Sequence, residues 1–383
     1  MRGLAVALVS LALLVPGAAA EMGMTGRVAF IHDGRVILVD LATGKRTVAL
    51  TQAPAGPLRW SGDAKLLSDA GRIAGGPKLH TSQVVWAPSG ETAAYATKSG
   101  EVALWRPTGS QAVVPATWGA TSMAWGPNGT LALGRTICHV PCGMPRHQEV
   151  WTWRAGSLRR VVGPLPGVVR PIVTGFSADG RVLWWPDEQG SASLAADGLL
   201  LHANNSRIAT TLAFPDYVVR CGRHLAVAAG SDRFTTHGKR ILVDGRDVSR
   251  DRTRSWVSPS CDPEGIVIAA AGRNWQEAGF GHEHRAIWQL LPARKRLTQP
   301  PPGWTDENPH LLADGSILFV RTRQTAHKVN GEWFTTSRGL IELLMRGKLV
   351  HVANVGFTSS EVKGPWLNYY GHYNWPWRIA VAP

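Results

Sequence analysis

The chain has 383 residues, 44% of them hydrophobic, and its 41 Lys and Arg against 27 Asp and Glu give a formal net charge of +14. This apolar fraction excludes an intrinsically disordered chain, and 42 Gly, 25 Pro and 17 Trp exclude a bundle of long helices. The composition instead favours tight turns with large aromatic side chains packed between sheets. The basic excess predicts attraction to anionic partners, and arginine-rich usage across a genome is the alternative explanation.

The first twenty residues have the form of a secretory signal. Arg2 precedes an apolar segment from Leu4 to Val15, and Ala18-Ala-Ala20 provides an A-x-A cleavage site. The apolar segment is short for a membrane span, and no later segment resembles one. We therefore expect residues 1–20 to be removed and residues 21–383 to form one mature domain, secreted or held in the periplasm or cell envelope.

Short strands are predicted from residue 27 onwards. Arg27 to Ile31 and Val36 to Asp40 flank a turn at Asp33-Gly34, and a second turn ending at Gly44 leads into a third strand. The segment from residue 58 to residue 77 is too short for four strands. It counts either as a reduced unit or as part of its neighbours.

A pattern of strand, tight turn and strand then returns along the chain. It is clearest from Val84 to Gly100, where an apolar run ends at Trp86 and Pro88-Ser89-Gly90 reverses the chain. The turn glycine returns at intervals of about 40 to 50 residues, which is the period of a propeller blade. The turn glycines are Gly90, Gly129, Gly180, Gly222, Gly265 and Gly315.

The repeat predicts an all-β fold, a single β-propeller of four-stranded antiparallel blades, because one blade cannot bury its faces alone. Seven blades are expected, with six or eight as alternatives; counting residues 58–77 as a reduced blade gives eight. The first repeat lacks an innermost strand, and Trp377 to Ala382 is a strand without a blade. Pairing of this C-terminal strand with Arg27 to Ile31 would close the ring and remove an open sheet edge.

The segment RVILVDLATGKRTVALT, residues 35–51, together with the W-x-P-x-G turns, resembles the TolB-like propeller repeat. In that repeat a W-S-P-D-G turn precedes a strand, an I-x-V-x-D-x-x-x-G strand and turn follow, and the unit ends in L-T. The resemblance covers most of the mature chain and implies architecture only, because such propellers serve many unrelated functions. The sequence departs from it at Trp60-Ser-Gly-Asp63, which lacks the proline, and at Cys221-Gly222, where the turn is contracted.

Four cysteines fit an oxidising compartment. Cys138 and Cys142 are close in sequence, whereas Cys221 and Cys261 occupy the same place in two successive repeats. Of the three connectivities we predict 138–142 and 221–261. The second bridge requires that equivalent residues of neighbouring blades approach within the Cα separation of about 7 Å that a disulfide allows.

The strand order places one class of loop on one face of the ring. If the strands of a blade are named A to D from the channel outward, the B–C connections project from this face. Four of them are expected to be long loops: Thr136 to Glu149, Gly230 to Lys239, Gly272 to His284 and Arg321 to Arg338. Long loops on a rigid scaffold are where binding sites usually lie. They supply the predicted binding-face residues Arg146, His147, Arg233, His237, Arg273, His282, His284, Arg323, His327 and Lys328.

An aromatic segment near the C-terminus is a second candidate site. Its rings either stack on sugars or cover the base of the ring as a plug, and we prefer the plug because the segment leads into the closing strand. The candidate aromatic platform consists of Trp366, Tyr369, Tyr370, Tyr373 and Trp375.

No familiar catalytic motif occurs in the sequence, which lacks G-x-S-x-G, H-E-x-x-H and a phosphate-binding glycine loop. His282-Glu-His284 could share a metal, but no third ligand is fixed. We therefore predict no cofactor, no metal and no catalytic residue. The alternative is an enzyme, a lactonase or a polysaccharide lyase or hydrolase, in which His282, His284 and His327 act at the mouth of the channel.

The function that the sequence favours is that of a non-catalytic binding or scaffolding module in the cell envelope or outside the cell. Its expected partner is an anionic wall polysaccharide or an envelope protein, held on the face that carries the long basic loops. We expect a monomer, without specific nucleic-acid binding and without a membrane span after signal cleavage.

Overall fold

The computed structural model describes residues 26–52, 56–79, 83–109, 111–114, 117, 119–137, 147–165, 169–188, 199–211, 218–229, 239–273, 284–329, 332–355 and 378–382. Every regular element within these ranges is a β-strand, as predicted. The predicted signal segment, residues 1–20, lies outside them. In this part of the chain no helix has the length and apolar character needed to cross a membrane.

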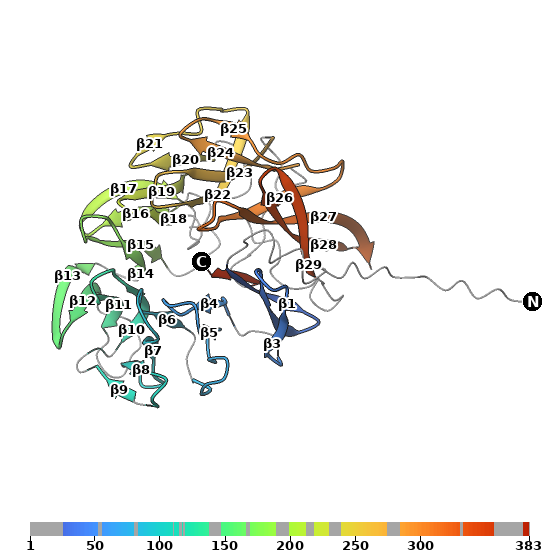
Figure 1. Cartoon of the computed structure of the whole chain (residues 1–383). Helices are drawn as coiled ribbons and strands as arrows, with labels where there is room; N and C mark the ends of the chain where they lie inside the picture. Colours follow the sequence, from blue (N-terminus) through green and yellow to red (C-terminus); the bar gives the residue numbers. More distant parts are fainter. Residues whose placement is uncertain are drawn as a thin grey trace, which may run out of the picture.

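The strands form seven four-stranded antiparallel blades arranged in a ring (Figure 1). We number the blades in chain order from the one that contains β1. Blade 1 consists of β30 (Ile379–Ala382), β1 (Arg27–His32), β2 (Arg35–Asp40) and β3 (Arg46–Leu50). Blade 2 consists of β6 (Val84–Trp86), β7 (Ala93–Ala96), β8 (Val102–Trp105) and β9 (Gln111–Val113). Blade 3 consists of β10 (Ala120–Trp125), β11 (Leu131–Ile137), β12 (His147–Arg154) and β13 (Ser157–Leu165).

The remaining blades follow the same strand order. Blade 4 consists of β14 (Val169–Phe176), β15 (Val182–Glu188), β16 (Leu199–Ala203) and β17 (Ser206–Thr211). Blade 5 consists of β18 (Val218–Cys221), β19 (His224–Ala229), β20 (Arg240–Val243) and β21 (Arg246–Asp247). Blade 6 consists of β22 (Arg254–Cys261), β23 (Val267–Arg273), β24 (Ala286–Leu291) and β25 (Lys295–Arg296). Blade 7 consists of β26 (Thr305–Leu311), β27 (Ile317–Val329), β28 (Glu332–Met345) and β29 (Lys348–Val355).

The C-terminal strand closes the ring, as predicted. β30 pairs antiparallel with β1, with Arg27 opposite Ala382 and Phe30 opposite Ile379. The amide of Ile31 adds a bond of 3.1 Å to the carbonyl of Arg378. The first blade is thus completed by the last strand of the chain, which leaves no unpaired edge on β1.

A two-stranded hairpin lies between blades 1 and 2. β4 (Arg59–Trp60) pairs with β5 (Leu67–Ser68), and β4 contacts both β30 and β6, the innermost strands on either side. The segment from residue 58 to residue 77 therefore forms a reduced unit of its own in the ring. The ring consists of seven full blades and this hairpin.

Tryptophans at the ends of three inner strands join the hairpin, blade 2 and blade 3 each to the unit before it. The indole N–H of Trp60 donates to the carbonyl of Ala380 at 3.1 Å, and that of Trp86 to the Ser68 hydroxyl at 2.8 Å. The indole of Trp125 donates to the carbonyl of Val85 at 3.3 Å. The tryptophan that precedes several of the predicted turns is therefore a structural link between units of the ring. The turns themselves form as predicted, because all six turn glycines have a positive φ.

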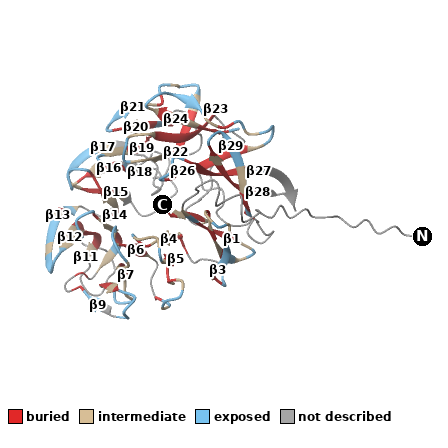
Figure 2. Ribbon diagram, viewed as in Figure 1, coloured by how far each residue is buried: buried red, intermediate tan, exposed pale blue. Residues whose placement is uncertain are grey.

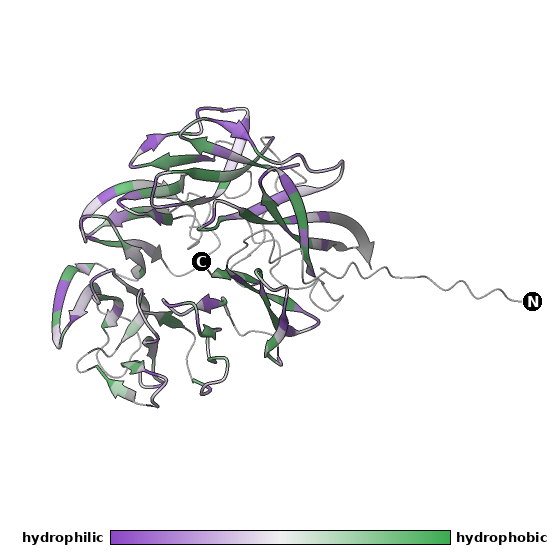
Figure 3. Cartoon of the chain, viewed as in Figure 1, coloured by the Kyte–Doolittle hydropathy of each residue, from purple (hydrophilic) through white to green (hydrophobic). Residues whose placement is uncertain are grey.

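The hydrophobic core lies between adjacent blades (Figures 2 and 3). Strands such as β23 are buried along most of their length, because both of their faces pack against a sheet. One cluster joins blade 7 to blade 1 through Phe30, Leu318, Val320 and Ile379. This two-sided burial explains why strands such as β7 and β23 are continuous apolar runs rather than alternating ones.

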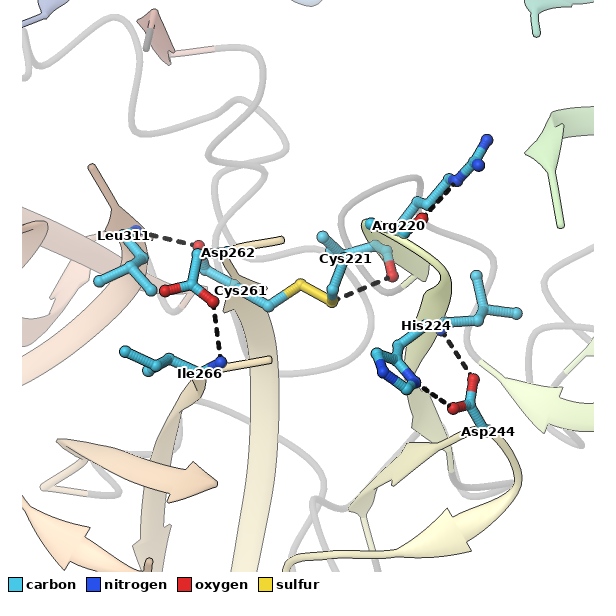
Figure 4. Close-up of a disulfide and its surroundings, with 12 residues drawn as sticks. Arg220, Cys221, His224, Asp244, Cys261, Asp262, Ile266 and Leu311 are labelled. Atoms are coloured by element: carbon cyan, nitrogen blue, oxygen red, sulfur yellow. Dashed lines mark hydrogen bonds and ion pairs between the residues drawn. A yellow bond between two sulfur atoms is a disulfide. The ribbon is translucent and has the colours of Figure 1, made fainter. Parts of the chain in front are cut away.

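The predicted bridge between Cys221 and Cys261 is present (Figure 4). Its Cα atoms lie 5.5 Å apart, so equivalent positions of blades 5 and 6 are close enough for a disulfide. The bridge joins the C-terminal ends of the two inner strands, β18 and β22. Cys138 and Cys142 lie outside the described residues.

The structure corrects one loop prediction. Residues 321–338 were expected to form a B–C loop, but β27 and β28 continue as a ladder out to Val329, which pairs with Glu332. The sequence explains the extension, because Asn330-Gly331 is a preferred pair for a two-residue hairpin connection and threonines flank it. This arm adds extended strand pairing to the B–C end of blade 7.

Candidate functional site

The predicted binding-face residues whose side chains the structure describes lie at the B–C ends of their blades. His147 begins strand C of blade 3, and Arg273 ends strand B of blade 6. His284 lies two residues before strand C of blade 6, and Arg323 lies in the extended part of β27. These four residues therefore share one end of the ring, because successive strands of each blade run antiparallel.

The other predicted residues are not placed by the structure. His327 and Lys328 belong to β27, where only the backbone is described. The remaining predicted residues lie outside the described ranges: Arg146, Arg233, His237, His282, Trp366, Tyr369, Tyr370, Tyr373 and Trp375.

His147 belongs to a local network on blade 3. Its Nε2 lies 3.5 Å from Oε1 of Glu149, a buried carboxylate. The same carboxylate accepts a bond of 2.7 Å from Arg160 and one of 2.6 Å from the indole of Trp151. His147 is thus engaged with an acid that two other donors already satisfy.

Arg273, His284 and Arg323 come together where blades 6 and 7 meet. Ala271 pairs with Ala286, so Arg273 and His284 lie at adjacent strand ends. Nδ1 of His284 is 3.4 Å from the carbonyl of Trp304, in the segment that leads into blade 7. Gly303, the residue before Trp304, lies beside Arg323. A Cβ built on this glycine would be 4.0 Å from Nε of Arg323. The segment Gly303-Trp304 therefore contacts His284 and lies beside Arg323.

Two pairs of arginines face each other across strands at this junction. In blade 6 Arg254 is opposite Arg273, and in blade 7 Arg323 is opposite Arg338. Like charges at directly opposed positions destabilise a sheet. The first pair is partly compensated, because Arg254 Nε lies 3.3 Å from Oδ2 of Asp251 and its guanidinium stacks on a tryptophan ring.

The other three arginines of these pairs are exposed. Arg273, Arg323 and Arg338 form no hydrogen bond or ion pair with any residue that the structure describes. We call these three residues the arginine cluster. An exposed group of like charges at one junction raises the local concentration of anions.

Two acids of β26, at the same junction, are buried and already paired. Arg321 binds Asp306 through two bonds of 2.6 and 3.0 Å, and Arg285 binds Glu307 at 2.8 Å. Burial raises the pKa of the Asp306 carboxyl above its ordinary value, against the opposing effect of Arg321. These two carboxylates therefore form internal ion pairs, and no acid among the described residues is paired with the arginine cluster.

The buried pairs and Arg338 were missed by sequence reasoning. A cross-strand register would have been needed to place Arg338 opposite Arg323, and the sequence was interpreted there as a loop. No hydropathy signal marks the burial of Asp306 and Glu307, because their strand, TDENPHL, is mostly polar. Within the described residues, no group of three His, Cys, Asp or Glu is arranged to hold a metal ion.

No family model and no curated protein matches the chain. An acylaminoacyl peptidase of Pyrococcus horikoshii matches with a TM-score of 0.42 and 10% identity, over 84% of this chain and 48% of its own. The chain thus spans about half the length of that peptidase.

Two further solved structures match at similar levels. A GH74 xyloglucanase from Xanthomonas campestris has a TM-score of 0.37 and 12% identity, over 71% of this chain and 45% of its own. The β-propeller domain of Myceliophteria thermophila Cps50 (Swd1) has a TM-score of 0.36 and 12% identity, over 70% of this chain and 93% of its own. Likeness at these levels assigns no function, and the fold rests on the strand order of the chain itself.

Proposed function

We propose that the chain is an exported, non-catalytic β-propeller that binds an anionic polymer with the B–C end of blades 6 and 7. The observation that carries the proposal is the arginine cluster: three exposed guanidinium groups without partners among the described residues, which belong to two cross-strand arginine pairs. Stability alone does not favour such pairs, whereas a polyanion placed over them would be bound by all of them. A wall polysaccharide fits the predicted export.

The rigid support of the arginine cluster favours binding over a passive excess of charge. Arg273 ends a buried strand, and Arg323 and Arg338 lie on a paired hairpin arm rather than on an isolated loop. The buried Arg285–Glu307 pair joins blade 6 to blade 7, and the Arg321–Asp306 pair joins two strands within blade 7. Preorganised cations lose less conformational entropy on binding than cations on free loops.

Charge reversal at the arginine cluster tests the proposal. The variant carries Arg273→Glu, Arg323→Glu and Arg338→Glu, and the matched control carries Arg106→Glu, Arg154→Glu and Lys348→Glu. The control residues are exposed cations at the opposite, C–D end of blades 2, 3 and 7, so both variants change the net charge equally. Because the Debye length is about 8 Å at physiological salt, only the first triple should weaken binding strongly.

The measurement is retention on immobilised heparin, used as a polyanion probe, across a salt gradient. We expect the cluster variant to elute at lower salt than the wild type and the control variant to elute close to the wild type. Both should remain folded, because exposed substitutions usually change stability by about 0.5 kcal/mol or less each. Elution of both variants at the same salt would show that the charge is only compositional.

A further inference from the structure

A cavity of about 650 Å³ lies at the centre of the ring. Its wall is formed by the innermost strands of five blades, β30, β6, β10, β14 and β26, together with the hairpin strand β4. This volume is in the range of small-molecule binding sites. The cavity is separate from the arginine cluster, none of whose residues lines it.

Arg59 is an uncompensated cation in the wall of this cavity. Its guanidinium makes no hydrogen bond or ion pair with any described residue, and no described lining residue is Asp or Glu. Burial lowers the pKa of Arg59, and arginine remains protonated even so. The Arg59 side chain is half-buried, and charges withdrawn from water in folded proteins are usually paired with an opposite charge. The missing counter-charge points to an anionic ligand.

The other titratable group among the described lining residues is His310. Burial lowers the pKa of His310 to about 4, so its imidazole is neutral at pH 7. Its Nε2 lies 3.0 Å from Nδ2 of Asn308, also in the wall. Arg59 therefore supplies the charge of the described lining at neutral pH, which matches a ligand with one negative charge better than one with two.

Polar and aromatic lining residues limit the rest of the ligand. Thr174 Oγ1 and Trp185 Nε1 are buried without a hydrogen-bond partner among the described residues, and an indole N–H can only donate. The indoles of Trp60, Trp86 and Trp125 also line the cavity, and their N–H groups are used between blades. What they offer is mainly ring surface, which suits a ligand with a ring-shaped body.

We propose that the central cavity binds a small molecule with a single carboxylate, held by Arg59, and a ring that packs against the tryptophans. The planar guanidinium matches a carboxylate in a two-bond geometry. This site is independent of the proposed polyanion site, so either can fail without the other.

The experiment compares two carboxylates with their uncharged counterparts: glucuronate with glucose, and benzoate with benzamide. Binding is measured by calorimetry on the wild type, on Arg59→Gln and on the control Arg106→Gln. We expect at least one carboxylate to bind the wild type about tenfold or more tightly than its neutral counterpart, because a charge-assisted bond is gained. Arg59→Gln should remove this preference, and Arg106→Gln should retain it.

A second variant and a second readout separate binding from folding. Arg59→Lys keeps the charge and should keep part of the preference for the carboxylate. Without ligand, Arg59→Gln should melt at or above the wild-type temperature, because an unpaired buried charge has been removed. Equal binding of carboxylates and neutral counterparts by the wild type would overturn the proposal, as would tight carboxylate binding by Arg59→Gln. Inorganic phosphate that binds more tightly than both carboxylates would overturn the assignment of a carboxylate.

Discussion

Closure of the ring by β30 makes Ile379 a sensitive position. The side chain is 2% exposed, lies opposite Phe30 in the ladder, and belongs to the hydrophobic cluster that joins blade 7 to blade 1. Replacement by alanine leaves a cavity in the hydrophobic cluster between blades 7 and 1. Core substitutions of isoleucine by alanine cost about 2 to 5 kcal/mol, and we expect about 3 kcal/mol here because the strand is at the end of the chain.

The assay is urea and thermal unfolding followed by circular dichroism, with Val381→Ala as the matched control. Val381 is on the same strand but only partly buried, so its substitution should cost less than about 1 kcal/mol. Ile379→Ala should lower the melting temperature by about 5 °C, and truncation after Arg378 should destabilise further and expose a sheet edge that aggregates. An Ile379→Ala variant within about 0.5 kcal/mol of the wild type would refute the reasoning, and so would an unchanged melting temperature of the truncated chain.

Two further predictions concern the disulfide and a buried histidine. Replacing Cys221 and Cys261 together by alanine should lower the free energy of unfolding by up to about 4 kcal/mol, given their separation of 40 residues; free thiols at both positions in unreduced protein, seen by mass spectrometry, would contradict the bridge. Because folding lowers the pKa of His310 to about 4, the unfolded chain binds the proton first, and stability should fall by roughly 3 kcal/mol as the pH drops from 7 to 4. His310→Gln should flatten this part of the stability profile, and an equally steep loss in that variant would assign the effect to other groups.

Much of the fold could be predicted because the repeat fixes the phase of each blade. Once the turn glycines mark the end of every strand A, the missing first strand and the surplus last strand can be matched to each other. The same phase places Cys221 and Cys261 at equivalent positions, and their distance of 5.5 Å follows from the close approach of inner strands. The extended arm of blade 7 was missed because its residues are polar, so hydrophobic alternation gives no signal there.

The candidate site could be predicted only in part. Chain topology places Arg273, His284 and Arg323 at one end of the ring, but it does not say which blades bring them together. That depends on cross-strand register and on the contact between blades 6 and 7. The cavity was not predicted either, because nothing in the sequence around Arg59 shows that the guanidinium has no counter-charge among the described residues of the folded ring.

The most direct test of the proposed function is the salt dependence of heparin binding by the wild type and the two charge-reversal triples. If the arginine cluster holds the polyanion, the logarithm of the wild-type binding constant falls steeply with the logarithm of the salt concentration. The cluster variant should then show a slope smaller by about two or more, since each cation in contact releases about one counterion. The control variant should keep the wild-type slope. Identical slopes for all three proteins would contradict the proposal, and salt-independent binding lost on substitution of Trp366 or Tyr370 would assign the partner to the aromatic platform instead.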